Sequence, residues 1–176
     1  ATTLNGRQQP LRVFSLGLPV NTLTQEGLAI LAEHLSGNLT LARLRGLALR
    51  VVAIDLMLRH ADFGHTVQVL VEEHATTPAE AFDLAVRVHR GGGLTKDYLY
   101  LRGLREILAL WQERSLDNLF IGKTSLAWLG LIDELRAREL VSAPAHVPAI
   151  LAAPVEPDPV VAFIVQSIQA PRRAVG

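Results

Sequence analysis

Three consecutive glycines, Gly91 to Gly93, stand between cationic side chains in the middle of the chain. Arg87 and Arg90 precede them, and Lys96 follows at the point where a new helix is expected to begin, near Thr95. The N–H groups at a helix start form a site for an anion when cations lie nearby. A phosphate or a carboxylate would suit such a site, although the spacing of a P-loop is absent. A flexible connector with solvated charges explains the same residues equally well.

The six histidines are scattered, and none belongs to a His-Glu-x-x-His motif. His60 and His65, five positions apart across a turn, are more typical of polar helix ends than of metal ligands. We interpret Glu72, Glu73 and His74 in the same way, as a solvated helix end. The chain has no cysteine, which excludes disulfides, a thiolate nucleophile and cysteine-bound zinc.

Glu26 is a further candidate for a functional-site residue, and it lies in the first turn of a helix expected to begin near Thr24. On physical grounds alone, its carboxylate interacts favourably with the helix dipole or takes part in the cap. Gly27 follows directly, and a residue without a side chain lets another backbone approach closely.

The elements that must position these residues are helices, so we expect a mainly α fold. Leucines at i, i+3 and i+7 indicate a helix up to Ser36, and Thr77, Pro78 and Glu80 form a strong N-terminal helix signal. Residues 1–22 are expected to be irregular, with an extended segment at Leu11–Leu18. The expected helices are residues 24–36, 40–59, 66–74, 77–90, 95–111, 126–140 and 160–169.

Composition excludes several classes of protein. Seventeen Lys and Arg balance seventeen Asp and Glu, so the basic excess of a nucleic-acid-binding protein is absent. A hydrophobic content of 49% argues against intrinsic disorder, yet no apolar run reaches the ~18–20 residues of a membrane span. We therefore expect a cytoplasmic protein that binds neither nucleic acid nor a membrane.

The string Gln25-Glu26-Gly27-Leu28-Ala29 resembles the signature of the QEGLA-motif family. This family is also described as flavohaemoglobin expression-modulating and as tyrosine/phenylalanine carboxypeptidase-like, and it includes the microtubule-associated tyrosine carboxypeptidases. Further blocks are similar to the family in the same order, and the likeness covers roughly residues 1–140. These blocks are Asn5–Leu11, Gly92–Asp97, Tyr100–Gly103 and Ile121–Lys123.

The resemblance implies a zinc peptidase that releases a C-terminal Tyr or Phe from peptides or proteins. In that family a His-Glu-x-x-x-His helix and a downstream Glu bind the metal, and Glu26 matches the downstream Glu. Three protein ligands leave a position for a water whose pKa zinc lowers to ~7. The histidine segment precedes a stretch like residues 1–6 in the family. We therefore expect Zn²⁺ to need ligands from a segment before Ala1, and this fragment alone to be inactive.

A carboxypeptidase must also recognise a free carboxylate, which is usually done by Arg or Lys. Lys96 and Arg90 are the first candidates and Arg87 the next. An oxyanion donor is needed as well, and Tyr100, which matches a family block, is favoured over Tyr98.

Two units of organisation are expected: residues 1–141 as the C-terminal part of a carboxypeptidase-like helical domain, and residues 142–176 as a proline-rich loop and short helix packed on it.

The alternative function is a non-catalytic helical regulatory or interaction module. In either case, the face that a missing N-terminal part would cover is expected to be apolar and able to drive self-association.

Overall fold

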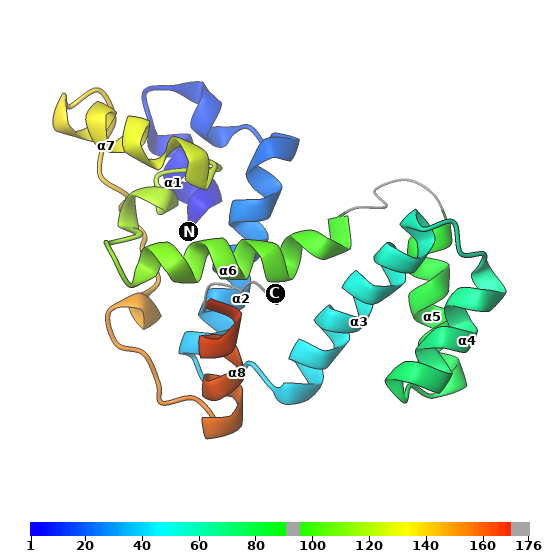
Figure 1. The fold of residues 1–176 in the computed structure, drawn as a ribbon. Coiled ribbons are helices and arrows are strands. Elements are labelled where there is room, and N and C mark those ends of the chain that lie inside the picture. Colours follow the sequence, from blue (N-terminus) through cyan, green and yellow to red (C-terminus); the bar gives the residue numbers. More distant parts are fainter. Residues whose placement is uncertain (91–95, 170–176) are drawn as a thin grey trace, which may run out of the picture. The chain divides into compact units, whose positions relative to one another are not determined.

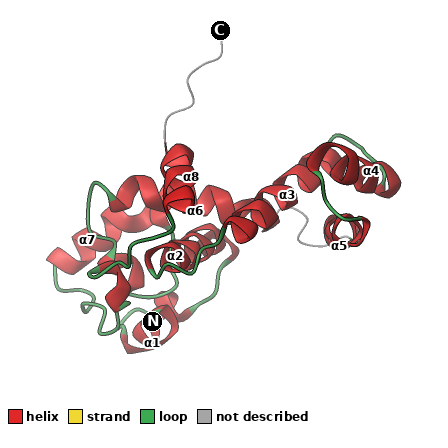
Figure 2. Cartoon of the chain, turned by 90° about the horizontal axis from the view of Figure 1, so that it is seen from below, coloured by secondary structure: helices red, strands yellow, loops and turns green. Residues whose placement is uncertain are grey.

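The computed structural model describes residues 1–90 and 96–169, and within these ranges all regular structure is helical (Figures 1 and 2). The expected mainly α fold is therefore confirmed. No helix in the described ranges is both long and apolar enough to cross a membrane. The segment Gly91–Thr95, with the three glycines and the expected helix start, lies outside the described residues.

The chain divides into two compact units. Unit 1 comprises residues 1–39 and 102–176, and unit 2 comprises residues 40–101. Helix α6 (Leu99–Trp111) contains the boundary at residue 101. The expected division after residue 141 stays a prediction.

Unit 1 contains most of the helices. Its α-helices are α1 (Thr2–Gln8), α2 (Thr22–Leu35), most of α6, α7 (Leu129–Ala137) and α8 (Pro159–Gln169). Short 3₁₀ helices connect them: η1 (Arg12–Ser15), η2 (Pro19–Asn21), η4 (Asp117–Phe120), η5 (Leu126–Trp128) and η6 (Ala149–Leu151).

Two expectations about the first 22 residues are wrong. Helix α1 forms where irregular structure was expected, and η1 replaces the extended segment at Leu11–Leu18. Tertiary packing explains both, because Gly6 of α1 lies directly against the backbone of Phe14 in η1. A Cβ on Gly6 would lie 2.3 Å from the Phe14 carbonyl oxygen. This contact determines the structure here, whereas local propensity does not.

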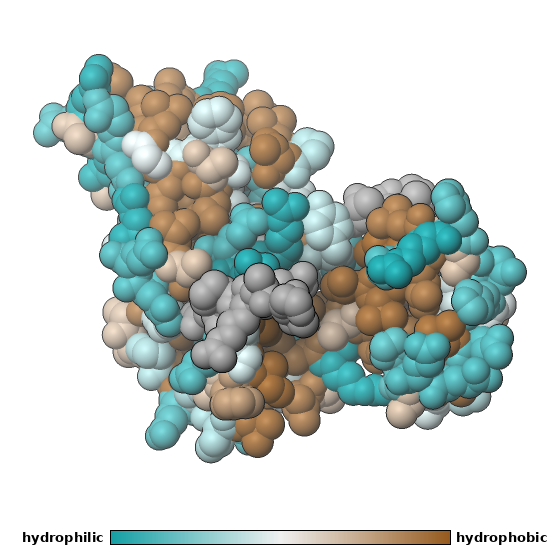
Figure 3. Space-filling model, in the orientation of Figure 1, coloured by the Kyte–Doolittle hydropathy of each residue, from teal (hydrophilic) through white to brown (hydrophobic). Residues whose placement is uncertain are grey.

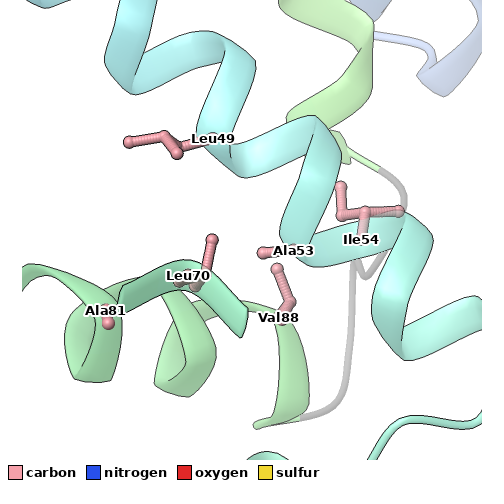
Figure 4. Close-up of a cluster of buried hydrophobic side chains, with 6 residues drawn as sticks. All are labelled: Leu49, Ala53, Ile54, Leu70, Ala81 and Val88. Carbon is pink, nitrogen blue, oxygen red and sulfur yellow. The ribbon is translucent and has the colours of Figure 1, made fainter. Parts of the chain in front are cut away.

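Unit 2 is built from α3 (Leu41–Leu58), α4 (Phe63–His74), α5 (Pro78–His89) and η3 (Lys96–Tyr98). Its core gathers small and branched side chains from three helices (Figure 4): Leu49, Ala53 and Ile54 from α3, Leu70 from α4, and Ala81 and Val88 from α5. Small side chains such as those of Ala53 and Ala81, both fully buried, allow close packing of the helices.

The predicted start of α5 is confirmed. The Thr77 hydroxyl accepts a hydrogen bond from the Glu80 N–H at 3.2 Å, and Glu80 accepts from the Thr77 N–H at 3.0 Å. The bond from the Thr77 N–H to the ionised carboxylate, together with a second one from the Thr77 hydroxyl, lowers the pKa of Glu80. The next helix to the N-terminal side, α4, begins at Phe63 rather than at Thr66, because Asp62 caps it through the His65 N–H.

Candidate functional site

Helix α2, which carries Glu26, is fixed in unit 1 by its neighbours. The Asn21 side chain donates a hydrogen bond to the Lys123 carbonyl at 2.6 Å, and the Thr24 hydroxyl accepts one from the Leu126 N–H at 2.7 Å. These bonds anchor the first turn of the helix to one loop. Glu26, which is half-buried, follows directly after this anchored turn.

Gly27 makes the closest backbone contact of this helix. A Cβ added to Gly27 would lie 2.5 Å from the carbonyl carbon and oxygen of Gly103 in α6. In the reverse direction, a Cβ on Gly103 would lie 2.4 Å from the Leu23 carbonyl oxygen. Helices α2 and α6 therefore cross where both have glycine, and the expected close backbone approach at Gly27 is confirmed.

Gln25 lies next to the beginning of α1. The Thr2 hydroxyl donates a hydrogen bond to the Gln25 side-chain oxygen at 3.0 Å. The Gln25 side-chain nitrogen, in contrast, is buried and has no hydrogen-bond partner among the described residues. A buried amide nitrogen without an acceptor is costly, so this position is suited to an additional acceptor group.

Metal ligands do not gather elsewhere in the described part of the chain. Within it, no three His, Asp or Glu side chains come close enough together to hold an ion. The described residues can offer zinc the single carboxylate of Glu26, and a tight zinc site requires three or four protein ligands. By themselves they do not fit a zinc ion.

In unit 2, the candidate Arg87 is bound to a buried acid. Its guanidinium donates two hydrogen bonds to Asp97, one from Nε and one from Nη2, the latter at 2.6 Å. Asp97 is 7% exposed, and Nη1 of Arg50 lies 3.8 Å from its Oδ1. The bond to Asp97 raises the pKa of Arg87. A bidentate pair of this kind uses the donors that a substrate carboxylate would need.

Arg90 and Tyr100 lie near this ion pair. A hollow of about 350 Å³ is lined by Arg50, Arg87 and Arg90 together with the acidic Asp83. The guanidinium carbon of Arg50 also lies 5.8 Å from the centre of the Tyr100 ring. Unit 2 thus brings Arg87 and Arg90 to one hollow and links Tyr100 to it through Arg50.

Lys96 is exposed and begins η3, directly before Asp97. Glu26 belongs to unit 1, whereas Lys96, Arg90 and Tyr100 belong to unit 2. Sequence reasoning missed Arg50, the residue shared by the ion pair and the tyrosine contact. A signal was present, because Arg50 is a cation within an otherwise apolar stretch of α3, where a buried partner is expected.

The structural role of Arg87 can be tested against Arg90. Arg87→Gln is expected to destabilise unit 2 by about 2 kcal/mol, because it leaves the buried Asp97 carboxylate without its bidentate partner. This value is at the low end for such pairs because the Arg87 side chain is 36% exposed. Urea unfolding monitored by tyrosine fluorescence reports on unit 2, which contains Tyr98 and Tyr100, both tyrosines of the chain.

Arg90→Gln is the matched control, since Arg90 is exposed at the end of α5. Its effect is expected to stay below about 0.5 kcal/mol. Equal effects of the two substitutions would contradict a structural role for Arg87.

Comparison with protein families adds an independent finding. The family model described as microtubule-associated tyrosine carboxypeptidase matches residues 1–169. None of the curated proteins and none of the solved structures matches the chain. The match covers nearly the whole chain, including the Glu26 helix and the Arg87–Tyr100 region, and the chain therefore belongs to the microtubule-associated tyrosine carboxypeptidase family.

Proposed function

We propose that this chain is part of a zinc-dependent carboxypeptidase that releases a C-terminal Tyr or Phe from peptides or proteins, with Glu26 as one metal ligand. The remaining ligands and the general base would come from a segment preceding Ala1. The observation that carries this assignment is the hydrogen bond from Thr2 to Gln25. The bond brings the first turn of α1 against the residue next to Glu26, which is the neighbourhood that ligands from a preceding segment would require.

The buried side-chain nitrogen of Gln25 supports the same arrangement. It has no acceptor among the described residues, and the oxygen of the same amide is bonded to Thr2 in the first turn of α1. Gln25 would then position that segment relative to Glu26. When bound, the zinc ion supplies a Lewis acid and a water of lowered pKa.

The other site residues follow from chemistry and from the family-like blocks. Lys96 and Arg90 are proposed to bind the terminal carboxylate of the substrate, and the Tyr100 hydroxyl to donate to the oxyanion. Arg87 is better described as a positioning residue, because its guanidinium is bound to Asp97.

Zinc stoichiometry tests the role of Glu26. The chain extended at its N-terminus by the residues that its gene encodes is expected to hold one zinc ion, measured by elemental analysis after dialysis. Glu26→Gln should lose the ion or bind it at least about tenfold more weakly, because losing support around a metal typically costs 10–100-fold in affinity. Release of C-terminal Tyr or Phe from peptides should fall with it.

Glu33→Gln is the matched control, since Glu33 lies two turns further along the same face of α2. It should leave the zinc content unchanged. A folded extended chain without zinc, or one whose zinc is insensitive to Glu26→Gln, would contradict the metal role. Without zinc, the alternative of a non-catalytic helical interaction module becomes the better one.

A further inference from the structure

A groove of about 380 Å³ lies in unit 1 between the segment that precedes α2 and helix α7. Its rim consists of aliphatic side chains and one tryptophan: Leu11, Val13, Leu18, Val20, Trp128 and Leu131. Lys123 also lines it, and we call it the Lys123 groove. In the face seen in Figure 3, apolar side chains gather over α7 and the segment before α2.

The floor of the groove belongs to the hydrophobic core. Phe14 and Ile132 line the groove, and both are buried in one cluster with Ile121. Gly122 lies so close to Phe14 that a Cβ would be 2.5 Å from the Phe14 carbonyl oxygen. The Lys123 N–H donates to this same oxygen at 2.8 Å. The groove is therefore preformed, and a ligand does not need to order it.

The rim, in contrast, is open to solvent. Trp128 is 54% exposed, Leu131 53% and Val13 51%. Single exposed apolar residues are common, but several around one hollow indicate an interaction site. Trp is among the residues most enriched at the centres of protein interfaces.

Lys123 determines which charge the groove accepts. It is the one ionisable residue among those lining the groove, and its side chain makes no ion pair with another described residue. Its backbone is held on both sides, by Phe14 and by the Asn21 side chain. An ammonium group beside an apolar surface, without a nearby acid, is complementary to a carboxylate next to apolar side chains.

The groove is separate from the proposed metal ligand. The Thr24 side chain points to the loop that carries Lys123, where it accepts a hydrogen bond from Leu126. Glu26 is two residues further along α2, which turns its side chain by roughly 160° from that of Thr24. Glu26 therefore faces away from the loop that borders the groove.

We propose that the Lys123 groove is a docking site for a peptide segment of a partner protein, which inserts bulky apolar side chains and pairs a carboxylate with Lys123. This assigns a role to the block Ile121–Lys123: Gly122 allows the approach to Phe14, and Lys123 recognises the acid. The site acts at a distance from Glu26, and its existence does not depend on zinc binding there.

Selection from a phage library of random peptides on the whole chain tests this assignment. The selected peptides should combine two or more bulky apolar residues with an Asp or Glu. Anisotropy of a labelled synthetic peptide should show about tenfold weaker binding to Leu131→Asp. Leu140→Asp is the matched control, because Leu140 is 52% exposed and does not line the groove, and it should bind like the parent chain.

Charge exchange gives the sharpest readout. Lys123→Glu should weaken binding of the acidic peptide, and a peptide with Lys in place of its acid should regain affinity for this variant. Three outcomes would overturn the proposal. In the first, the selected peptides bind Leu131→Asp as well as the parent chain. In the second, no peptide binds, and the chain instead associates with itself in a way that Leu131→Asp abolishes. In the third, no peptide binds, and the chain instead binds phosphatidylcholine vesicles in a way that the same change abolishes.

Discussion

Gly27→Ala is expected to destabilise unit 1 by about 3 kcal/mol or more, one of the two largest effects in this chain, because the added methyl group meets backbone rather than a movable side chain. The Cβ would lie 2.5 Å from the Gly103 carbonyl group. Relief requires α2 and α6 to separate, which would also displace Glu26. Gly103→Ala, with a Cβ 2.4 Å from the Leu23 carbonyl oxygen, should have a similar effect.

Urea unfolding monitored by tryptophan fluorescence measures this effect, since Trp111 and Trp128 both belong to unit 1. The double variant should cost clearly less than the sum of the single ones, because one separation of the helices relieves both contacts. Gly130→Ala is the control: a Cβ there has nothing within 4 Å. It should be neutral or stabilising by up to about 1 kcal/mol. A loss below about 1 kcal/mol for Gly27→Ala would mean that the helices do not cross this closely.

Two adjacent positions of the QEGLA motif thus have different reasons for their residue types: Gly27 a packing reason, and Glu26 one that comes from the family resemblance. Gly27 is needed for packing, and this was predictable from the sequence because the side chain is absent. Its partner Gly103 was not, because nothing in a single sequence says which of the other twelve glycines faces it. Glu26 has no comparable packing reason, and its assignment depends on the family.

The helices were predictable where local signals and packing agree. The Thr77–Glu80 capping box marks the start of α5 and forms as expected. Helix α1 was missed because its sequence contains Gly6 and polar residues, with no apolar periodicity. It is instead specified by contacts with distant segments, which periodicity does not report.

The candidate site shows the same limit. The sequence identified a group of cations around the glycines, and Arg87 and Arg90 do line one hollow. It could not show that Arg87 is bound to Asp97, ten positions away, because the sequence carries no information about which acid a cation pairs with. The number of cations in this region without a carboxylate partner of their own is therefore smaller than composition suggests.

Two side-chain amides, Asn5 in α1 and Gln9 directly after it, bind the proline-rich segment after Val141. Pro144 and Pro148 have no N–H groups, so this segment has few backbone donors with which to attach itself. Asn5 donates to the carbonyls of Phe120 and His146, both at 2.7 Å, and accepts from the His146 N–H at 3.0 Å. Gln9, four residues later, exchanges two hydrogen bonds with the backbone of Ser142.

Asn5→Ala is therefore expected to destabilise unit 1 by about 3 kcal/mol, because Asn5 is fully buried and its removal leaves three backbone groups without partners. Asn5→Asp should be equally damaging, although its size is unchanged, because a carboxylate would face two carbonyl oxygens. Asn38→Ala is the control: Asn38 is exposed, and among the described residues its side chain bonds only to Ser36, so the change should stay within about 0.5 kcal/mol.

Unfolding followed by tryptophan fluorescence distinguishes hydrogen bonding from packing at Asn5. If hydrogen bonds dominate, Asn5→Asp matches or exceeds the loss in Asn5→Ala, whereas a packing role makes the Asp variant nearly neutral. Limited proteolysis should also cut the segment after Val141 faster in both variants, since α1 no longer holds it. Unchanged cleavage would show that the loop is held by its other contacts, such as the Val155 N–H to Leu35 carbonyl hydrogen bond of 2.7 Å. Because Thr2 of the same helix contacts Gln25, the proposed function adds the expectation that a displaced α1 weakens zinc binding by the extended chain.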